Sequence, residues 1–491
     1  MFVQRIQSDA VKISIVGLLL GICFSYSQIY VLSIFPLAVY MYISTQKKTF
    51  KEAIRLQFLF FLTMYLSSLS FLWAMYPLSF LEVSRIQAIG LLLLGWGGLS
   101  IMASLFYIVI SVIAQFQKTS FLRGIVLVLG WCLAEVALEY AGFPWLRVGN
   151  LTLFSPIFSS IASIGGVFLC TLLWLLVALC ISQMNRRGMI LLTVVVLLWG
   201  SIGYLFTTTP QNSSTYLVSL IQGNISSQEK WDEEAFRYNE EIHQELLSQV
   251  SNDSQAIFLA ETIFPFTQYQ ESTLYQEMTS LPVYYGAFEG EDDIYNSLCS
   301  VETQECYHKR YLVPFGEYIP KWMSNLFPLL NDFQFAGYIS EGKEAITLTS
   351  LIGTISPLIC YESIFPHLVS TGDLIYIASN DSWFDGSQEP LQHVAHARMR
   401  SIEQGVDTVR VGNTGITCII DRMGTITDQL PVRTRGILEG NIHIYKEGSI
   451  YSRNPWIHNI LPLGCLVVLL MISLQGDKKR ILELKLMLYG R

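Results

Sequence analysis

The sequence predicts a bundle of about eight membrane-spanning helices joined to a layered α/β domain. Hydrophobic residues make up 52% of the 491 positions and charged residues only 14%, against roughly 25% charged residues in soluble domains. Long apolar runs are confined to residues 1–210 and 456–475. Residues 211–455 have the composition of a soluble domain and alternate between strand and helix patterns. We therefore expect three parts: about seven helices in 1–210, the α/β domain in 211–455, and a last helix with a basic tail in 456–491.

Eight apolar segments are long enough to cross a bilayer, which takes about 20 helical residues. They are expected near residues 11–27, 28–45, 56–76, 88–116, 122–141, 158–182, 188–207 and 456–475. No small-residue cleavage site follows the first segment, so we interpret it as an anchor rather than a cleaved signal peptide.

Basic residues gather in alternate short loops, which sets the expected orientation because such loops stay in the cytoplasm. The other short loops hold only Arg85 and Arg147. Both termini are thus expected in the cytoplasm and residues 211–455 on the periplasmic or outer face of the cytoplasmic (inner) membrane. The basic clusters comprise Arg5, Lys12, Lys47, Lys48, Lys51, Arg55, Lys118, Arg123, Arg186, Arg187, Lys478, Lys479 and Arg480.

Glu135 and Glu139 lie in or near the fifth predicted helix. A carboxylate at that depth is costly and points to a function unless it is satisfied locally. We favour local satisfaction, with Glu135 hydrogen-bonded inside the bundle and Glu139 reaching the outer interface.

Composition also excludes some functions. The net charge of −8 and the absence of a basic stripe paired with aromatic residues argue against nucleic-acid binding. The nine cysteines form no CxxC pair, and His393 and His396 share a helix face without a third ligand nearby in sequence. We expect no metal and no cofactor, and we interpret both histidines as structural.

The α/β domain is expected to start with a strand at residues 215–224. A helix follows, whose Ser226 and Glu229 have the spacing of a capping box. A further helix is expected at 393–405. The remaining strands are expected at 256–260, 283–288, 294–301, 307–313, 348–360, 374–379, 408–420 and 437–444.

Three residues at predicted strand ends carry groups suited to acyl chemistry. Cys360 ends a strand and turns at once into the next segment, a position that exposes a nucleophile. Glu261 also ends a strand and can serve as a base, and Lys309 can stabilise an oxyanion with Glu317 holding it in place. Each has a plainer alternative: a buried thiol, a surface glutamate and an ordinary strand charge.

The order Glu261, Lys309, Cys360 resembles the Glu-Lys-Cys triad of the nitrilase superfamily. The flanking motifs, with the helix count and the turn at 142–145, resemble the bacterial apolipoprotein N-acyltransferase family over nearly the whole chain. Two positions depart from that pattern, Ala260 where proline is usual and Thr414 where asparagine is commoner. The matching motifs are 222–224, 230–231, 312–317, 359–362, 379–384, 397–403 and 413–417.

The resemblance implies a nitrilase-like αββα sandwich and a two-step acyl transfer. Cys360 would attack the sn-1 ester of a phospholipid, with phosphatidylethanolamine as the expected donor. Glu261 would act as base and Lys309 as oxyanion stabiliser. The acceptor would be the α-amine of a lipoprotein's diacylglyceryl-modified N-terminal cysteine. Further residues match family positions that support the site (Glu317, Tyr361 and Glu362) or contact the substrate (Trp231).

Residues 318–335 form an unusually apolar extramembrane loop that includes Trp322 and Phe327. We favour a lid that admits acyl chains over a loop packed on the domain. Cys299 and Cys306 flank an expected hairpin turn and either form a disulfide or remain two thiols.

Two other functions compete with the transferase. A membrane-tethered amidase would use the same three residues and resolve the acyl-enzyme with water. A transporter with an inert sensing domain would need polar residues at the midplane of several helices, and the sequence offers little beyond Glu135.

Overall fold

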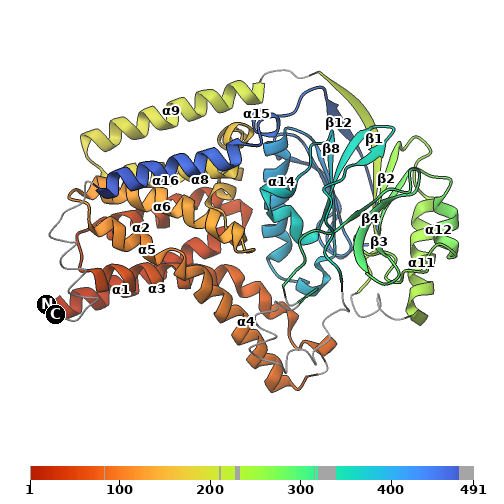
Figure 1. The fold of residues 1–491 in the computed structure, drawn as a ribbon, viewed down its shortest axis with the longest axis horizontal. Helices are drawn as coiled ribbons and strands as arrows, with labels where there is room; N and C mark the ends of the chain where they lie inside the picture. Colours follow the sequence, from red (N-terminus) through yellow and green to blue (C-terminus); the bar gives the residue numbers. More distant parts are fainter. Residues whose placement is uncertain are drawn as a thin grey trace. The chain divides into compact units, whose positions relative to one another are not determined.

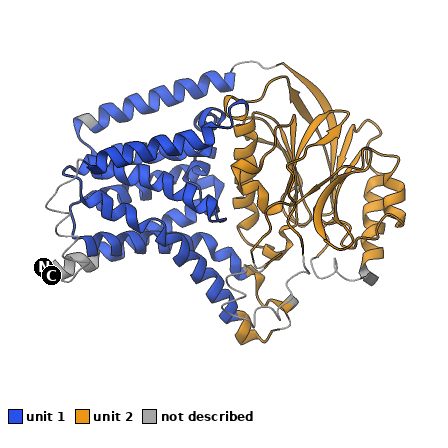
Figure 2. Cartoon of the chain, in the orientation of Figure 1, with its two compact units in different colours: residues 1–73, 89–209, 453–491 blue, residues 74–88, 210–452 orange. Residues whose placement is uncertain are grey.

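The computed structural model describes residues 2–81, 83–208, 212–226, 233–314, 316–318 and 339–474. The chain divides into two compact units (Figure 2). The first comprises residues 1–73, 89–209 and 453–491, and the second comprises residues 74–88 and 210–452.

The first unit is a bundle of helices (Figure 1). Seven helices among the described residues are long and apolar enough to cross a membrane. The 24-residue α1 (Phe2–Ser25) covers the first predicted segment as well, so the predicted multi-helix architecture is confirmed. The other helical elements up to residue 208 are η1 (Ser27–Ser33), α2 (Ile34–Ser44), α3 (Phe50–Ser68), η2 (Leu69–Met75), η3 (Ser79–Leu81), α4 (Arg85–Leu105), α5 (Ile108–Gln115), α6 (Ser120–Tyr140), η4 (Val148–Phe154), α7 (Pro156–Ser159), α8 (Ala162–Gln183) and α9 (Arg186–Thr208); α15 (Ile450–Arg453) and α16 (Ile457–Leu474) follow the α/β region.

The close packing of α1 on α3 follows from two glycines one turn apart. A Cβ at Gly17 would lie 2.3 Å from the Phe60 carbonyl oxygen, and one at Gly21 would lie 2.5 Å from the Met64 carbonyl oxygen. Small residues at this spacing let two membrane helices approach backbone to backbone. Any larger residue at either position would push the helices apart.

Glu135 hydrogen-bonds inside the bundle, as predicted. Its carboxylate accepts from the Trp131 indole at 3.1 Å, the Val148 amide at 3.0 Å and the Thr171 hydroxyl at 3.0 Å. The prediction for Glu139 is wrong: this side chain is buried and pairs with Arg147 instead of reaching an interface. The two buried charges compensate each other.

The second unit contains two six-stranded sheets, in the orders β12-β1-β2-β3-β4-β5 and β11-β10-β9-β8-β7-β6. Helices α11 (Glu233–Ser248) and α12 (Thr273–Met278) cover the first sheet and α14 (Glu389–Gln404) covers the second, giving four layers (Figure 1). The predicted αββα sandwich is confirmed. The strands are β1 (Ser213–Gln222), β2 (Ala256–Phe258), β3 (Val283–Glu289), β4 (Tyr295–Ser300), β5 (Cys306–His308), β6 (Leu348–Ser350), β7 (Gly353–Ile359), β8 (Leu374–Ser379), β9 (Thr408–Gly412), β10 (Cys418–Ile420), β11 (Ile426–Gln429) and β12 (Gly436–Tyr445), and the short 3-10 turns are η6 (Cys360–Ile364), η7 (Pro366–Leu368) and η8 (Asp381–Phe384).

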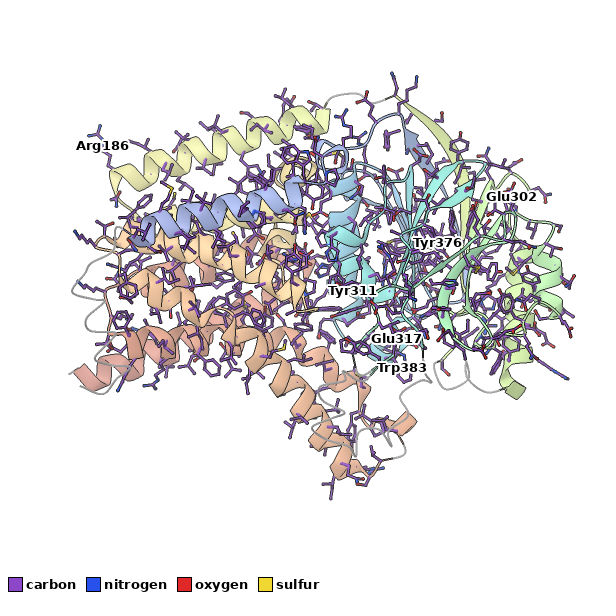
Figure 3. All side chains as sticks on the ribbon, in the orientation of Figure 1. Arg186, Glu302, Tyr311, Glu317, Tyr376 and Trp383 are labelled. Atoms are coloured by element: carbon purple, nitrogen blue, oxygen red, sulfur yellow. A yellow bond between two sulfur atoms is a disulfide. The ribbon has the colours of Figure 1, made fainter. Side chains whose placement is uncertain are left out.

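The core of this unit lies between the two sheets, where aliphatic and aromatic side chains from both are fully buried. Tyr376 on β8 crosses the core and donates its hydroxyl to the Leu259 carbonyl beyond β2 (Tyr376 is labelled in Figure 3). This hydrogen bond links the two sheets close to the strand ends that carry Glu261 and Cys360.

Several element boundaries differ from the predictions. The single strands expected at 348–360 and 408–420 are each two antiparallel strands, and the strand expected at 307–313 ends at His308. The capping box expected at Ser226 and Glu229 falls partly outside the described residues.

Candidate active site

The three predicted residues each follow the end of a strand. Glu261 comes three residues after β2, Lys309 directly follows β5, and Cys360 directly follows β7. Glu261 and Lys309 are 6% and 1% exposed, and Cys360 is partly buried. The fold thus brings together a thiol, a carboxylate and an ammonium group.

Lys309 lies between two carboxylates. Its Nζ donates to Glu317 Oε1 at 2.8 Å and lies 3.5 Å from Glu261 Oε1. Burial alone would lower the pKa of Lys309, but the carboxylates of Glu317 and Glu261 outweigh burial and raise it above its ordinary value. Lys309 is therefore positively charged, and it makes the contact with Glu317 that the sequence analysis expected (Glu317 is labelled in Figure 3).

Asn296 on β4 joins these groups, although no pattern in the sequence marks it as a site residue. Its side-chain amide donates to Glu261 Oε1 at 2.8 Å and to Glu317 Oε1 at 3.2 Å. Its backbone carbonyl oxygen accepts a hydrogen bond from the backbone N–H of Lys309 at 2.8 Å. One asparagine therefore holds both carboxylates and the backbone of Lys309. The antiparallel pairing of β4 with β5 brings Asn296 next to Lys309.

The backbone around Glu261 is tightly packed. A Cβ at Gly286 on β3 would lie 2.4 Å from the Thr262 amide nitrogen and 2.7 Å from the Ala260 carbonyl oxygen. Only glycine lets β3 pass this close, and Thr262 itself has a positive φ of 53°. The Glu261 carboxylate therefore projects from a rigid turn.

Cys360 has a φ of 49°, in the left-handed region that non-glycine residues rarely adopt. Such strain at a strand end is a feature of exposed nucleophiles. Burial and the Glu261 carboxylate raise the pKa of the Cys360 thiol, while Lys309 lowers it. Because the net direction is upward, the resting group is a thiol that needs a base before it can attack.

Glu362 ties the Cys360 turn to the segment that follows Lys309. Its Oε1 accepts from the Tyr307 hydroxyl at 2.7 Å, the Arg310 amide at 2.7 Å and the Tyr311 amide at 3.2 Å. Its Oε2 accepts from the Ile359 amide at 2.8 Å. Burial raises the pKa of Glu362. This side chain bridges β5 and β7 and thereby sets the separation of Lys309 and Cys360.

The other predicted residues are placed as follows. Tyr361 is buried and its ring packs edge-on against Phe365. Trp231, Trp322 and Phe327 lie outside the described residues, so their roles stay predictions.

One cluster at the site has atoms of metal-ligating type, from Cys360, Asp381 and His393, within 4.8 Å of one another. Asp381 already accepts from Arg410 at 2.6 Å, and His393 Nε2 lies 3.0 Å from the Cys360 carbonyl oxygen. The Asp381 carboxylate and the His393 ring are thus engaged in hydrogen bonds. The expectation that the site uses no metal stays a prediction.

The comparisons with known proteins cover both units. The model of the apolipoprotein N-acyltransferase N-terminal domain matches residues 16–180, and the carbon-nitrogen hydrolase model matches residues 274–449. A nitrilase-superfamily protein of known structure from Saccharomyces cerevisiae is 17% identical, covers 50% of this chain and 94% of its own, and has a TM-score of 0.35, too low to bear on the fold.

Relatives named apolipoprotein N-acyltransferase match most of the chain. The Geobacter metallireducens protein is 29% identical over 73% of this chain and 76% of its own length. The Azotobacter vinelandii protein is 31% identical over 67% and 68%. The Pseudomonas aeruginosa protein is 32% identical over 70% and 72%. The chain therefore belongs to the apolipoprotein N-acyltransferase family.

Proposed function

We propose that the chain moves a fatty acyl group from a phospholipid to a lipoprotein, through a thioester on Cys360. The observation that best supports this proposal is the buried cluster of Lys309 with Glu261 and Glu317. The charges of Glu261 and Lys309 act on the pKa of the Cys360 thiol. Family membership supplies the substrate class, because the relatives are named for acyl transfer to apolipoproteins.

In the first half-reaction, Glu261 takes the thiol proton of Cys360 and the sulfur attacks the sn-1 ester carbonyl of the donor. Lys309 stabilises the oxyanion as it forms. The ester C–O bond then breaks, and the proton on Glu261 passes to the departing lysophospholipid. The raised pKa of the thiol supports this role for a base, since little thiolate is present beforehand.

In the second half-reaction, the α-amine of the diacylglyceryl-modified N-terminal cysteine attacks the thioester. Glu261 accepts a proton from the attacking nitrogen, the C–S bond breaks, and the proton returns to the Cys360 sulfur. The products are an amide on the lipoprotein and the free enzyme. Glu317 and Asn296 keep Glu261 and Lys309 in position through both steps.

We also propose phosphatidylethanolamine as the donor and an inner-membrane location, with both termini cytoplasmic and the domain of residues 211–455 outside. The helices of 1–210 and 456–491 would hold that domain at the bilayer. The Cys299–Cys306 disulfide supports this orientation, because disulfides persist in oxidising compartments. Trp231, Trp322 and Phe327 would contact the lipid substrate.

The test uses the full chain in nanodiscs that contain phosphatidylethanolamine with an isotopic label in the sn-1 chain. After denaturation and digestion, mass spectrometry should find the labelled acyl group on the Cys360 peptide. Cys360→Ala should carry none, and Glu261→Gln should accumulate it far more slowly. A wild-type chain without acyl on Cys360, or a Cys360→Ala chain with the same total acylation, would refute the proposal.

A further inference from the structure

His393 lies against the backbone of Cys360. Helix α14 buries its ring to 1% exposure, and Nε2 lies 3.0 Å from the Cys360 carbonyl oxygen and 2.9 Å from the Ser363 hydroxyl. The Ser363 hydroxyl itself donates to that carbonyl at 2.9 Å. The Cys360 carbonyl is therefore held by two side chains in addition to its place in the turn.

Buried charges surround the other ring nitrogen of His393. Nδ1 lies 3.3 Å from Asp381 Oδ1 and 3.3 Å from Glu389 Oε1. Arg410 Nη2 lies 3.4 Å from Nδ1 and pairs with Asp381 at 2.6 Å. Burial and Arg410 lower the pKa of His393, but the two carboxylates outweigh them and raise it to about 9. At neutral pH the ring is an imidazolium, and both nitrogens donate.

The orientation of the Cys360 carbonyl also sets the orientation of the next backbone amide. In a planar trans peptide the C=O and the next N–H point in opposite directions, so the direction of the Cys360 carbonyl fixes that of the Tyr361 N–H. In strand-to-helix elbows the N–H after the nucleophile faces the oxyanion. Cys360 also has the strained φ of 49°, which its surroundings must maintain.

We propose that His393 is a positioning residue for the acylation step: its Nε2 holds the Cys360 carbonyl and so fixes the strained turn that aims the thiol and the Tyr361 N–H. The inference rests on the proposed function, since it assigns a role relative to the Cys360 nucleophile. It replaces the interpretation of His393 as purely structural.

Two amide substitutions separate positioning from core packing. The side-chain nitrogen of glutamine can occupy the place of Nε2 and keep the bond to the Cys360 carbonyl. The side-chain nitrogen of asparagine reaches only the place of Nδ1, beside Asp381 and Glu389. Both variants remove the same charge from the same buried place, so a purely structural role predicts equal effects on the acylation rate per folded molecule.

The experiment measures the single-turnover rate of acyl-enzyme formation in phosphatidylethanolamine nanodiscs for both variants. His393→Asn should slow acylation about 30-fold, the loss of one charge-assisted hydrogen bond of about 2 kcal/mol. His393→Gln should stay within about threefold of wild type, and the KM for the phospholipid should stay within about twofold in both. His243→Gln is the control, because His243 is equally buried on α11 and bonds the Asn239 carbonyl.

Equal rates in His393→Asn and His393→Gln would overturn the inference. If His393→Asn does not fold, Ser363→Ala decides instead. It removes the second donor to the same carbonyl and should slow acylation about three- to tenfold, and an unchanged rate would overturn the inference. A wild-type chain that forms no adduct on Cys360 would refute the proposed function itself, which separates the two failures.

Discussion

Asn296 offers the sharpest test of how the site is assembled. Replacing it by leucine keeps the branched shape and the number of side-chain heavy atoms and removes the amide that donates to Glu261 at 2.8 Å and to Glu317 at 3.2 Å. Lys309 still contacts both carboxylates, so the lost restraint on the base is about one charge-assisted hydrogen bond, or about 2 kcal/mol. That value corresponds to about a 30-fold slower acylation of Cys360.

Asn296→Asp should be slower still. It adds a third carboxylate about 3 Å from the other two, and two unit charges at that distance repel by about 5 kcal/mol at an effective dielectric constant of 20. The repulsion is relieved only by protonating one carboxyl group, which compromises the base.

The assay is single-turnover acylation followed by mass spectrometry, with thermal unfolding measured on the same samples. Ser297→Ala is the matched control, because Ser297 is the next residue on β4 and bonds the His308 ring instead. A folded Asn296→Leu chain that acylates Cys360 within about threefold of wild type would contradict the role assigned to Asn296.

Three further predictions concern stability. Replacing Cys299 and Cys306 by serine opens a disulfide of sequence separation 7 and should lower the free energy of unfolding by about 2.5 kcal/mol; denaturant unfolding without reductant would show it, and equal stability would count against the bond. The pKa of His393, about 9, lies above the ordinary 6.5, so its stabilisation is full below pH 6.5 and is lost as the pH rises through 9. The melting temperature should fall across that range in wild type but much less in His393→Gln, and parallel curves would show that other groups cause the loss. Glu139→Ala removes the carboxylate that pairs with the buried Arg147 and should lower the free energy of unfolding by about 3–5 kcal/mol. Adding Arg147→Leu should restore part of that loss, and two additive losses would disprove the coupling.

Local pattern was enough to find the strand ends on which the site is built. Cys360 and Glu261 each follow a buried strand, and that much is visible in a run of apolar residues followed by a polar one. The resemblance then joined Glu261, Lys309 and Cys360 into one site. The structure places Lys309 beside Glu261 and Glu317. The charges of Glu261 and Lys309 both act on the pKa of the Cys360 thiol.

The contacts that position these groups depend on tertiary structure and leave no local signal. Asn296 and His393 reach the site through strand pairing and helix packing across 35 and 33 residues of sequence. Glu139 was misplaced because its partner, Arg147, lies beyond the turn that ends α6. The strand β11 was missed because most of its four residues are exposed and a register shift interrupts its pairing with β10.

We expect the thioester on Cys360 to persist until an amine attacks it. The decisive experiment isolates the full chain with labelled acyl on Cys360 and adds either buffer alone or a diacylglyceryl-modified lipopeptide. The adduct should be stable in buffer, and the lipopeptide should take up the label rapidly on its α-amine. Release of the label as free fatty acid in buffer, at the same rate with or without lipopeptide, would contradict this expectation and identify a hydrolase.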